Sequence, residues 1–141
     1  MKLDLSSLQK AVGSLEKTIK VAGNQDLAAE LDNDAKDAIK AGVIQNFEFT
    51  YELCWKFMRR WLKENADVEE AEYPRTRKEL FRLAAHSGLI KEPLSWFSYG
   101  DARNLTSRTY DEDKAEMVYE AALNFIKDAK YLLERLQERN D

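Results

Sequence analysis

Apolar residues recur at steps of three and four positions along most of this 141-residue chain. That spacing places them on one face of an α-helix, whereas a half-buried strand would alternate strictly between apolar and polar residues. We find no alternating run bounded by turn residues, and only five glycines and two prolines interrupt the helical pattern. The chain is therefore predicted to be all-α.

The first half of the chain predicts two helices. The first begins near Ser7, ends at Gly23-Asn24, and has an apolar stripe at Leu8, Val12, Leu15 and Ile19. The second begins between Asp26 and Asp34, continues to about Asn65, and has its stripe at Ile44, Phe47, Tyr51, Cys54, Met58 and Trp61. A neighbouring apolar set widens this surface, at Phe49, Leu53 and Phe57. We expect so broad an apolar surface on the central helix, with its aromatic residues in the core.

After an acidic loop at 66–75, the second half predicts three more helices. One runs from about Thr76 to Ser87, with Leu80, Phe81, Leu83 and Ala84 facing inward, and ends at a left-handed Gly88 closed by Leu89. The next begins at Pro93, faces inward through Leu94, Trp96 and Phe97, and allows a close backbone approach at Gly100. The last begins between Thr109 and Asp111 and runs to about Glu138, with a stripe at Val118, Ala122, Phe125, Ala129, Leu132 and Leu136.

Thr109 and Glu112 have capping-box spacing at the start of that last helix. Together these patterns predict an antiparallel up-and-down bundle of about five helices, of the four-helix-bundle type. The length suits one domain spanning residues 1–141.

Charge and the rare reactive residues exclude several classes of protein. A net charge of -4 gives little general attraction for nucleic acid, so a phosphate contact must come from a local basic cluster. One cysteine, Cys54, excludes an internal disulfide, and with the single histidine, His86, it leaves no zinc-ligand spacing. We interpret Cys54 as a buried, inert thiol, His86 as structural, and expect no metal ion or cofactor. The absence of a long apolar run or signal sequence predicts a cytoplasmic protein outside the membrane.

The segment RNLTSRTY, residues 103–110, lies between the last two predicted helices and contains two guanidinium groups, an amide, three aliphatic hydroxyls and a phenol. If helical geometry persists through Ser107, Arg103 and Ser107 are neighbours one turn apart, as are Asn104 and Arg108. Arginine binds phosphate through a planar fork of donors, and the next helix would add free backbone N–H groups. The candidate phosphate- or nucleotide-binding residues are therefore Arg103, Asn104, Ser107 and Arg108.

A purely structural role for this segment fits the sequence equally well. Four acidic residues lie close enough in sequence to pair with both arginines and to cap the next helix: Asp101, Asp111, Glu112 and Asp113. The segment would then be a helix junction in a structural or regulatory interaction protein. Spacing alone does not separate the two interpretations.

Two segments resemble the nucleotidyltransferase substrate-binding protein family, helical members of the HEPN superfamily related to the HepT toxins. They are GVIQNFEFTYELCWKFMRRWL, residues 42–62, and DARNLTSRTYDE, residues 101–112. Family members carry an Arg-x4-His-x-Tyr motif in the second segment. The resemblance implies a HEPN-like bundle that dimerises with two motifs facing one cleft, and a small nucleotidyltransferase as partner. It also implies metal-independent RNA cleavage in HepT-type members, which the partner silences by adenylylating the motif tyrosine, here Tyr110.

The motif histidine is replaced in this chain by Arg108. Histidine can transfer a proton near neutral pH, whereas arginine stays protonated and can only bind or stabilise negative charge. We therefore expect a non-catalytic nucleotide- or RNA-binding homodimer that partners a nucleotidyltransferase. The alternative is a HepT-type endoribonuclease toxin of a toxin–antitoxin pair that works despite the substitution.

Overall fold

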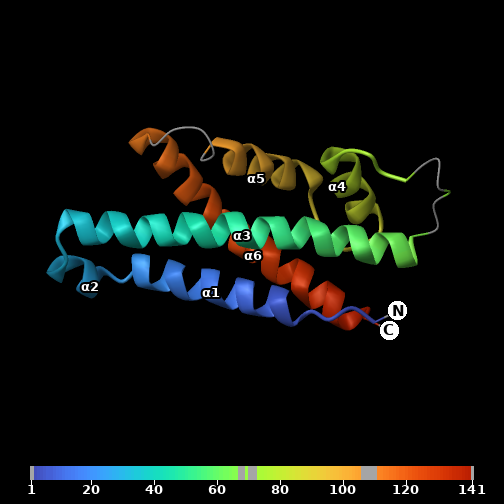
Figure 1. Cartoon of the computed structure of the whole chain (residues 1–141), viewed down its shortest axis with the longest axis horizontal. Coiled ribbons are helices and arrows are strands. Elements are labelled where there is room, and N and C mark those ends of the chain that lie inside the picture. Colours follow the sequence, from blue (N-terminus) through green and yellow to red (C-terminus); the bar gives the residue numbers. More distant parts are fainter. Residues whose placement is uncertain (1, 67–68, 70–72, 106–110, 141) are drawn as a thin grey trace.

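The computed structural model describes residues 2–66, 69, 73–105 and 111–140. Over these ranges the chain forms helices and no strand, which confirms the all-α prediction (Figure 1). The helices are α1 (Ser6–Ala22), α2 (Gln25–Glu30), α3 (Asn33–Asn65), α4 (Arg77–His86), α5 (Pro93–Leu105) and α6 (Glu112–Glu138). No helix within the described ranges is both long enough and apolar enough to cross a membrane.

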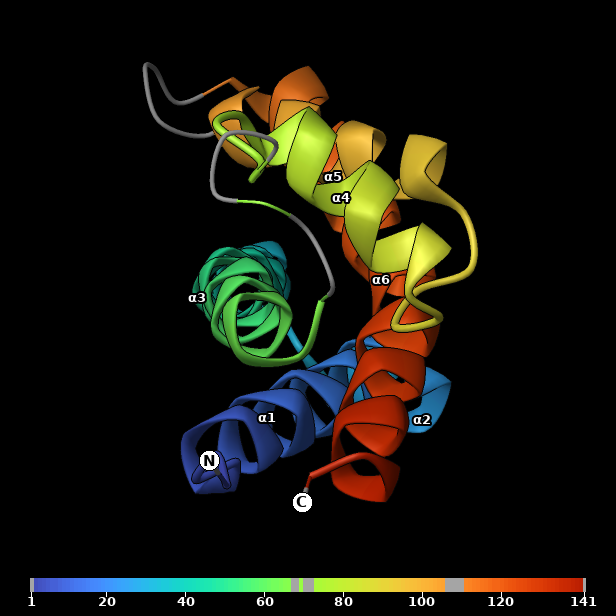
Figure 2. The same ribbon diagram turned by 90° about the vertical axis from the view of Figure 1, so that its right-hand side faces the viewer.

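The four longest helices, α1, α3, α5 and α6, alternate in direction, as an up-and-down bundle requires (Figure 1). The long α3 contacts α1, α4, α5 and α6, which confirms its prediction as the central helix. Seen end on, α1, α6 and the α4–α5 pair surround α3 on three sides, and none of the helices of the described residues covers its fourth side (Figure 2).

The apolar stripes form one core between these helices. All six predicted residues of the α6 stripe are fully buried, and Phe125 lies at the centre of the aromatic cluster. Its ring packs edge-on against those of Phe47, Trp96 and Tyr99, and at a tilted angle against that of Tyr51. Cys54 is fully buried as predicted, and burial raises the pKa of its thiol.

Two expectations about helix faces were wrong, and one short helix was not predicted. Phe49 and Leu94 were expected to face the core but are 59% and 64% exposed, because a periodic pattern identifies an apolar face without showing whether a neighbour covers it. The short helix α2 was not predicted, since none of its residues is buried and it has no apolar stripe. It is instead started by Asn24, whose side chain accepts a hydrogen bond from the Leu27 amide.

Helix α4 has the predicted bounds to within a residue, and its C-terminal end has the predicted cap. The Thr76 hydroxyl accepts from the amide of Glu79 at the N-terminus. At the other end Gly88 has φ +82°, the Leu89 amide donates to the carbonyl of Ala84, and Leu89 is fully buried. This is the Schellman arrangement, which turns the chain towards α5.

The start of α6 is capped differently from the prediction. The Asp111 carboxylate accepts from the amides of Asp113 and Lys114, so Asp111 is the N-cap. An acidic side chain here also interacts favourably with the positive end of the helix dipole. The predicted capping residue, Thr109, lies outside the described residues.

Candidate functional site

The polar segment RNLTSRTY begins in the last turn of α5, in agreement with its predicted start at the end of a helix. Arg103 and Asn104 belong to the last turn of α5, and α6 begins after Asp111. The other candidate residues lie outside the described part of the chain, so their roles stay predictions: Ser107, Arg108 and Tyr110. The geometry of the site is therefore built from Arg103 and its surroundings.

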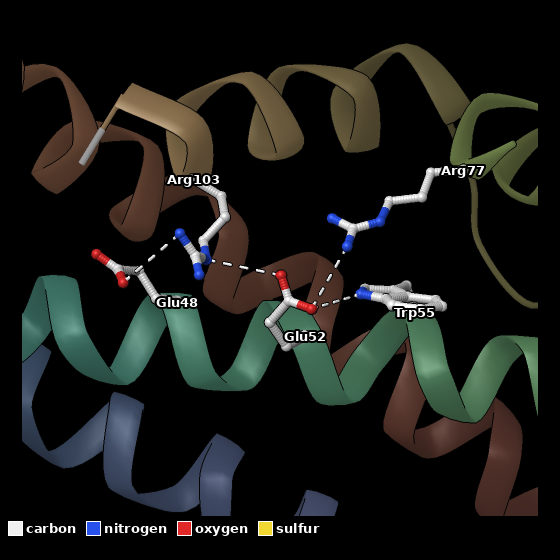
Figure 3. Close-up of polar contacts among 5 residues, drawn as sticks. All are labelled: Glu48, Glu52, Trp55, Arg77 and Arg103. Atoms are coloured by element: carbon white, nitrogen blue, oxygen red, sulfur yellow. Dashed lines mark hydrogen bonds and ion pairs between the residues drawn. The ribbon is translucent and has the colours of Figure 1, made fainter. Parts of the chain in front are cut away.

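Arg103 is held against the middle of α3 by two carboxylates. Its Nη1 lies 3.8 Å from Oε2 of Glu48, and its Nε lies 3.6 Å from Oε1 of Glu52 (Figure 3). Glu48 and Glu52 are one helical turn apart, so both project from the same face of α3. The Arg103 side chain is 27% exposed and lies at the C-terminal end of α5, where the helix dipole favours a cation.

Glu52 is the shared acceptor of this cluster. The indole Nε1 of Trp55 donates to its Oε2 at 2.8 Å, and Nη2 of Arg77 lies 3.5 Å from the same oxygen (Figure 3). With Arg103 on the other oxygen, one carboxylate connects the end of α5, the middle of α3 and the first residue of α4.

Gly100 allows α5 to approach α3 closely enough for these contacts, as the sequence predicted. A Cβ at this position would stand 2.8 Å from the hydroxyl oxygen of Tyr51. Tyr51 is 1% exposed, and burial raises the pKa of its phenol, an effect that Arg77 at the hydroxyl partly offsets. Arg103 follows Gly100 by less than one helical turn, so the same close approach brings Arg103 over α3.

Charge balance decides what the described part of the site can bind. Two carboxylates, Glu48 and Glu52, face two guanidinium groups, Arg77 and Arg103. A phosphate at Arg103 must therefore displace a carboxylate or draw on further positive charge, for which Arg108 is the sequence candidate. Among the described residues, no group of three or more His, Cys, Asp or Glu side chains is placed to share a metal ion.

The sequence interpretation missed Glu48, Glu52 and Arg77. The expected partners of Arg103 were acids close to it in sequence, whereas the two carboxylates found beside it come from the central helix. The available signal was the four-residue spacing of the two glutamates within the aromatic-rich middle of the central helix. Of the predicted acids, Asp111 does cap the next helix.

Comparison with known proteins gives consistent matches over nearly the whole chain. Residues 3–138 match the family described as nucleotidyltransferase substrate binding protein like. The chain is 37% identical to the probable ribonuclease HepT of Haemophilus influenzae, over 99% of this chain and 95% of that protein.

Two solved structures share the fold. That of HI0074 from Haemophilus influenzae, described as the fold of a substrate binding domain of a nucleotidyltransferase, superposes with a TM-score of 0.88 at 36% identity, covering 95% of this chain and 99% of the other. A Thermus thermophilus protein superposes with a TM-score of 0.72 at 26% identity, covering 92% of this chain and 98% of the other.

Proposed function

The chain belongs to the nucleotidyltransferase substrate-binding protein family, and we propose that it is a non-catalytic nucleotide-binding protein that works as a homodimer with a small partner nucleotidyltransferase. In this proposal a nucleotide phosphate is held at the junction of α5 and α6. Its ligands are Arg103, Asn104, Ser107 and Arg108.

The observation that carries the non-catalytic assignment is the arginine at the motif's histidine position, Arg108. Metal-independent RNA cleavage needs a group that accepts and returns a proton near neutral pH, and a guanidinium does neither. The chain's one histidine, His86, is exposed in the last turn of α4. Arg103 lies at the far end of α5 from α4 (Figure 1), which supports a motif that has no histidine beside it in the same chain.

Homodimerisation is supported by the family and by the surface of α3. Phe49 is 59% exposed on this helix, and one side of α3 is left uncovered by the other helices (Figure 2). A second protomer would remove this apolar side chain from water. A monomer in light scattering at micromolar concentration would contradict this part of the proposal.

The partner nucleotidyltransferase is proposed from the family, and Tyr110 as an adenylylation acceptor from its match to the motif. Intact-protein and peptide mass spectrometry after incubation with the partner and ATP tests this. An adenylyl mass on Tyr110 that is lost in Tyr110→Phe supports the assignment, and an unmodified Tyr110 contradicts it.

Binding is tested by titration calorimetry of the chain with ATP and with short single-stranded RNA. We expect Arg103→Ala combined with Arg108→Ala to weaken binding at least about tenfold, because two charge-assisted contacts are lost. Lys10→Ala with Lys17→Ala removes the same charge from exposed positions of α1 and serves as the matched control. Equal affinity of the motif variant and this control would remove the binding role from the motif.

The second candidate is a HepT-type endoribonuclease, which the name of the 37% identical relative favours. Incubation of the purified protein with RNA in the presence of EDTA distinguishes the endoribonuclease from the non-catalytic binding protein. Cleavage that Arg103→Ala abolishes would establish the ribonuclease, whereas intact RNA supports the binding protein.

A further inference from the structure

A concave site lies between the C-terminal half of α3 and the start of α4. It is a pocket of about 840 Å³, a size typical of small-molecule sites. The side chains that matter here are two aromatic rings and four cations: Trp55, Tyr73, Arg59, Lys63, Arg75 and Arg77. The sequence interpretation did not identify this pocket, because its residues are spread over α3, the following loop and α4.

The pocket concentrates positive charge in a chain whose net charge is -4. Arg77 is paired with Glu52, at 3.5 Å. The other three cations are Arg59, Lys63 and Arg75, and none of them forms an ion pair with a carboxylate of residues 2–66, 69, 73–105 or 111–140. This is the local basic cluster that an acidic protein needs in order to bind phosphate.

The pocket also has planar side chains beside its cations. The Arg77 guanidinium stacks on the Trp55 ring at 4.5 Å from its centroid, and the Trp55 indole N–H is fixed by Glu52 (Figure 3). The Tyr73 ring lines the pocket from the loop. Stacked aromatic and guanidinium planes bind nucleobases with little preference for the base.

Hydrogen bonds hold the walls of the pocket together without a ligand. The Tyr73 hydroxyl donates to the carbonyl of Arg59, which ties the loop to α3. The Arg75 amide donates to the Glu79 carboxylate, and the Glu79 amide donates to the Thr76 hydroxyl, and these two bonds tie the loop to α4. A pocket assembled in advance binds with a smaller entropic cost than one that must be ordered.

We propose that this pocket binds a nucleoside phosphate, with the phosphate on Arg59, Lys63 and Arg75 and the base against the planes of Trp55 and Tyr73. The ligand is either a free nucleotide or one nucleotide unit of a single RNA strand, since both present the same ring and phosphate. This site goes beyond the proposed function, because no described residue of the motif lines the pocket.

Calorimetric titrations of the full chain with AMP, ATP, adenosine and a short single-stranded RNA test the proposal. Arg59→Ala with Lys63→Ala is expected to weaken nucleotide binding at least about tenfold. Both side chains are exposed, so this variant keeps the fold, and the control is again Lys10→Ala with Lys17→Ala on the opposite side of α3 (Figure 1). Trp55→Phe keeps a planar ring and should retain most of the affinity that Trp55→Ala loses, while adenosine should bind more weakly than AMP.

The comparison of RNA with AMP identifies the kind of ligand, and the comparison of the pocket variant with the motif variant identifies the place where it binds. RNA binding tighter than AMP assigns the pocket to a strand, and equal affinity assigns it to free nucleotide. If Arg59→Ala with Lys63→Ala weakens binding and Arg103→Ala with Arg108→Ala does not, the pocket stands and the motif role fails. If the pocket variant binds as the control does, or if no nucleotide or RNA binds at millimolar concentration, the proposed pocket is overturned.

Discussion

The carboxylate of Glu52 lies 3.6 Å from Nε of Arg103, so the arginine that opens the motif is paired with the middle of the central helix. The same carboxylate accepts from Trp55 and pairs with Arg77, both of which line the neighbouring pocket. One acidic side chain therefore stands between the motif and the pocket and competes with an anion for Arg103 and Arg77.

Glu52→Gln should strengthen phosphate binding while weakening the fold. The amide keeps the shape of the side chain but removes the negative charge that competes for Arg103 and Arg77. We expect affinity for ATP to rise several-fold and the free energy of unfolding to fall by about 1 kcal/mol, a modest loss because the side chain is 27% exposed. Calorimetry and urea unfolding measure the two effects.

The matched control is Glu116→Gln, which removes the carboxylate paired with Lys40 at a more exposed position. It should change stability by less than about 0.5 kcal/mol and leave binding unaltered. Weaker ATP binding by Glu52→Gln would show that Glu52 positions the arginines for the ligand and does not compete with it.

Gly100→Ala should destabilise the contact between α5 and α3. The new methyl would stand 2.8 Å from the Tyr51 hydroxyl oxygen but 3.6 Å from the ring carbon that bears it. We expect the free energy of unfolding to fall, because overpacking costs about 1–3 kcal/mol while the gain in helix propensity is at most about 1 kcal/mol. Adding Tyr51→Phe removes the clashing oxygen and should recover stability. The coupling free energy between the two substitutions is then expected to be about 1 kcal/mol or more.

Gly42→Ala is the control for this cycle, since a methyl there meets no atom within 4 Å and Gly42 also lies inside a helix. It should raise stability by up to about 1 kcal/mol. Additive effects of Gly100→Ala and Tyr51→Phe would contradict the close contact between α5 and α3.

The fold could be predicted where periodicity extends over many turns. The α6 stripe gives six correct core positions because twenty-seven residues repeat one pattern, and Gly88 was recognisable because its cap has a chemical signature. The pattern failed at Phe49 and Leu94, where the apolar residue is present but its side chain stays exposed. Which faces are covered depends on how helices pack, and a single sequence does not encode that locally.

Only the part of the site whose residues lie close together in sequence could be predicted. The motif predicts a role for Arg103. Glu48 and Glu52, however, contact it from a helix some fifty residues earlier, and the close approach of α5 to α3 at Gly100 makes these contacts possible. The pocket combines α3, the following loop and α4 in the same way. Contacts across helices need the packing geometry first, so spacing within one segment could not identify them.

Tyr99 should make the protein lose stability at alkaline pH. Burial raises the pKa of its hydroxyl, and its hydrogen bond to Asp128 acts in the same direction. Above a pH of about 10 the unfolded chain loses this proton while the folded chain retains it, so the free energy of unfolding falls as pH rises. The contribution of Tyr99 is fully present at neutral pH.

Tyr99→Phe tests this assignment by urea unfolding at neutral pH and at a pH of about 10.5. The variant should be less stable at neutral pH by about 1 kcal/mol, because Asp128 loses its donor, and should show a shallower alkaline loss than the unmodified protein. If the loss of stability between neutral and alkaline pH is the same in Tyr99→Phe as in the unmodified protein, Tyr99 does not cause it. Tyr51→Phe would then be tested, because burial also raises the pKa of Tyr51.

Arg108→His should create RNA cleavage if the missing proton-transfer group is all that separates this chain from a nuclease. An imidazole titrates near a pH of about 6.5 and can take the 2′-hydroxyl proton, a contribution on the order of 10²–10⁴ in rate. We expect EDTA-resistant cleavage by Arg108→His with a maximum near neutral pH, lost again when Arg103→Ala is added. Arg108→Lys keeps the positive charge without a proton acceptor at neutral pH and should remain inactive. Cleavage by the unmodified chain at the rate of Arg108→His would show that Arg108 is no obstacle and that the protein is a ribonuclease.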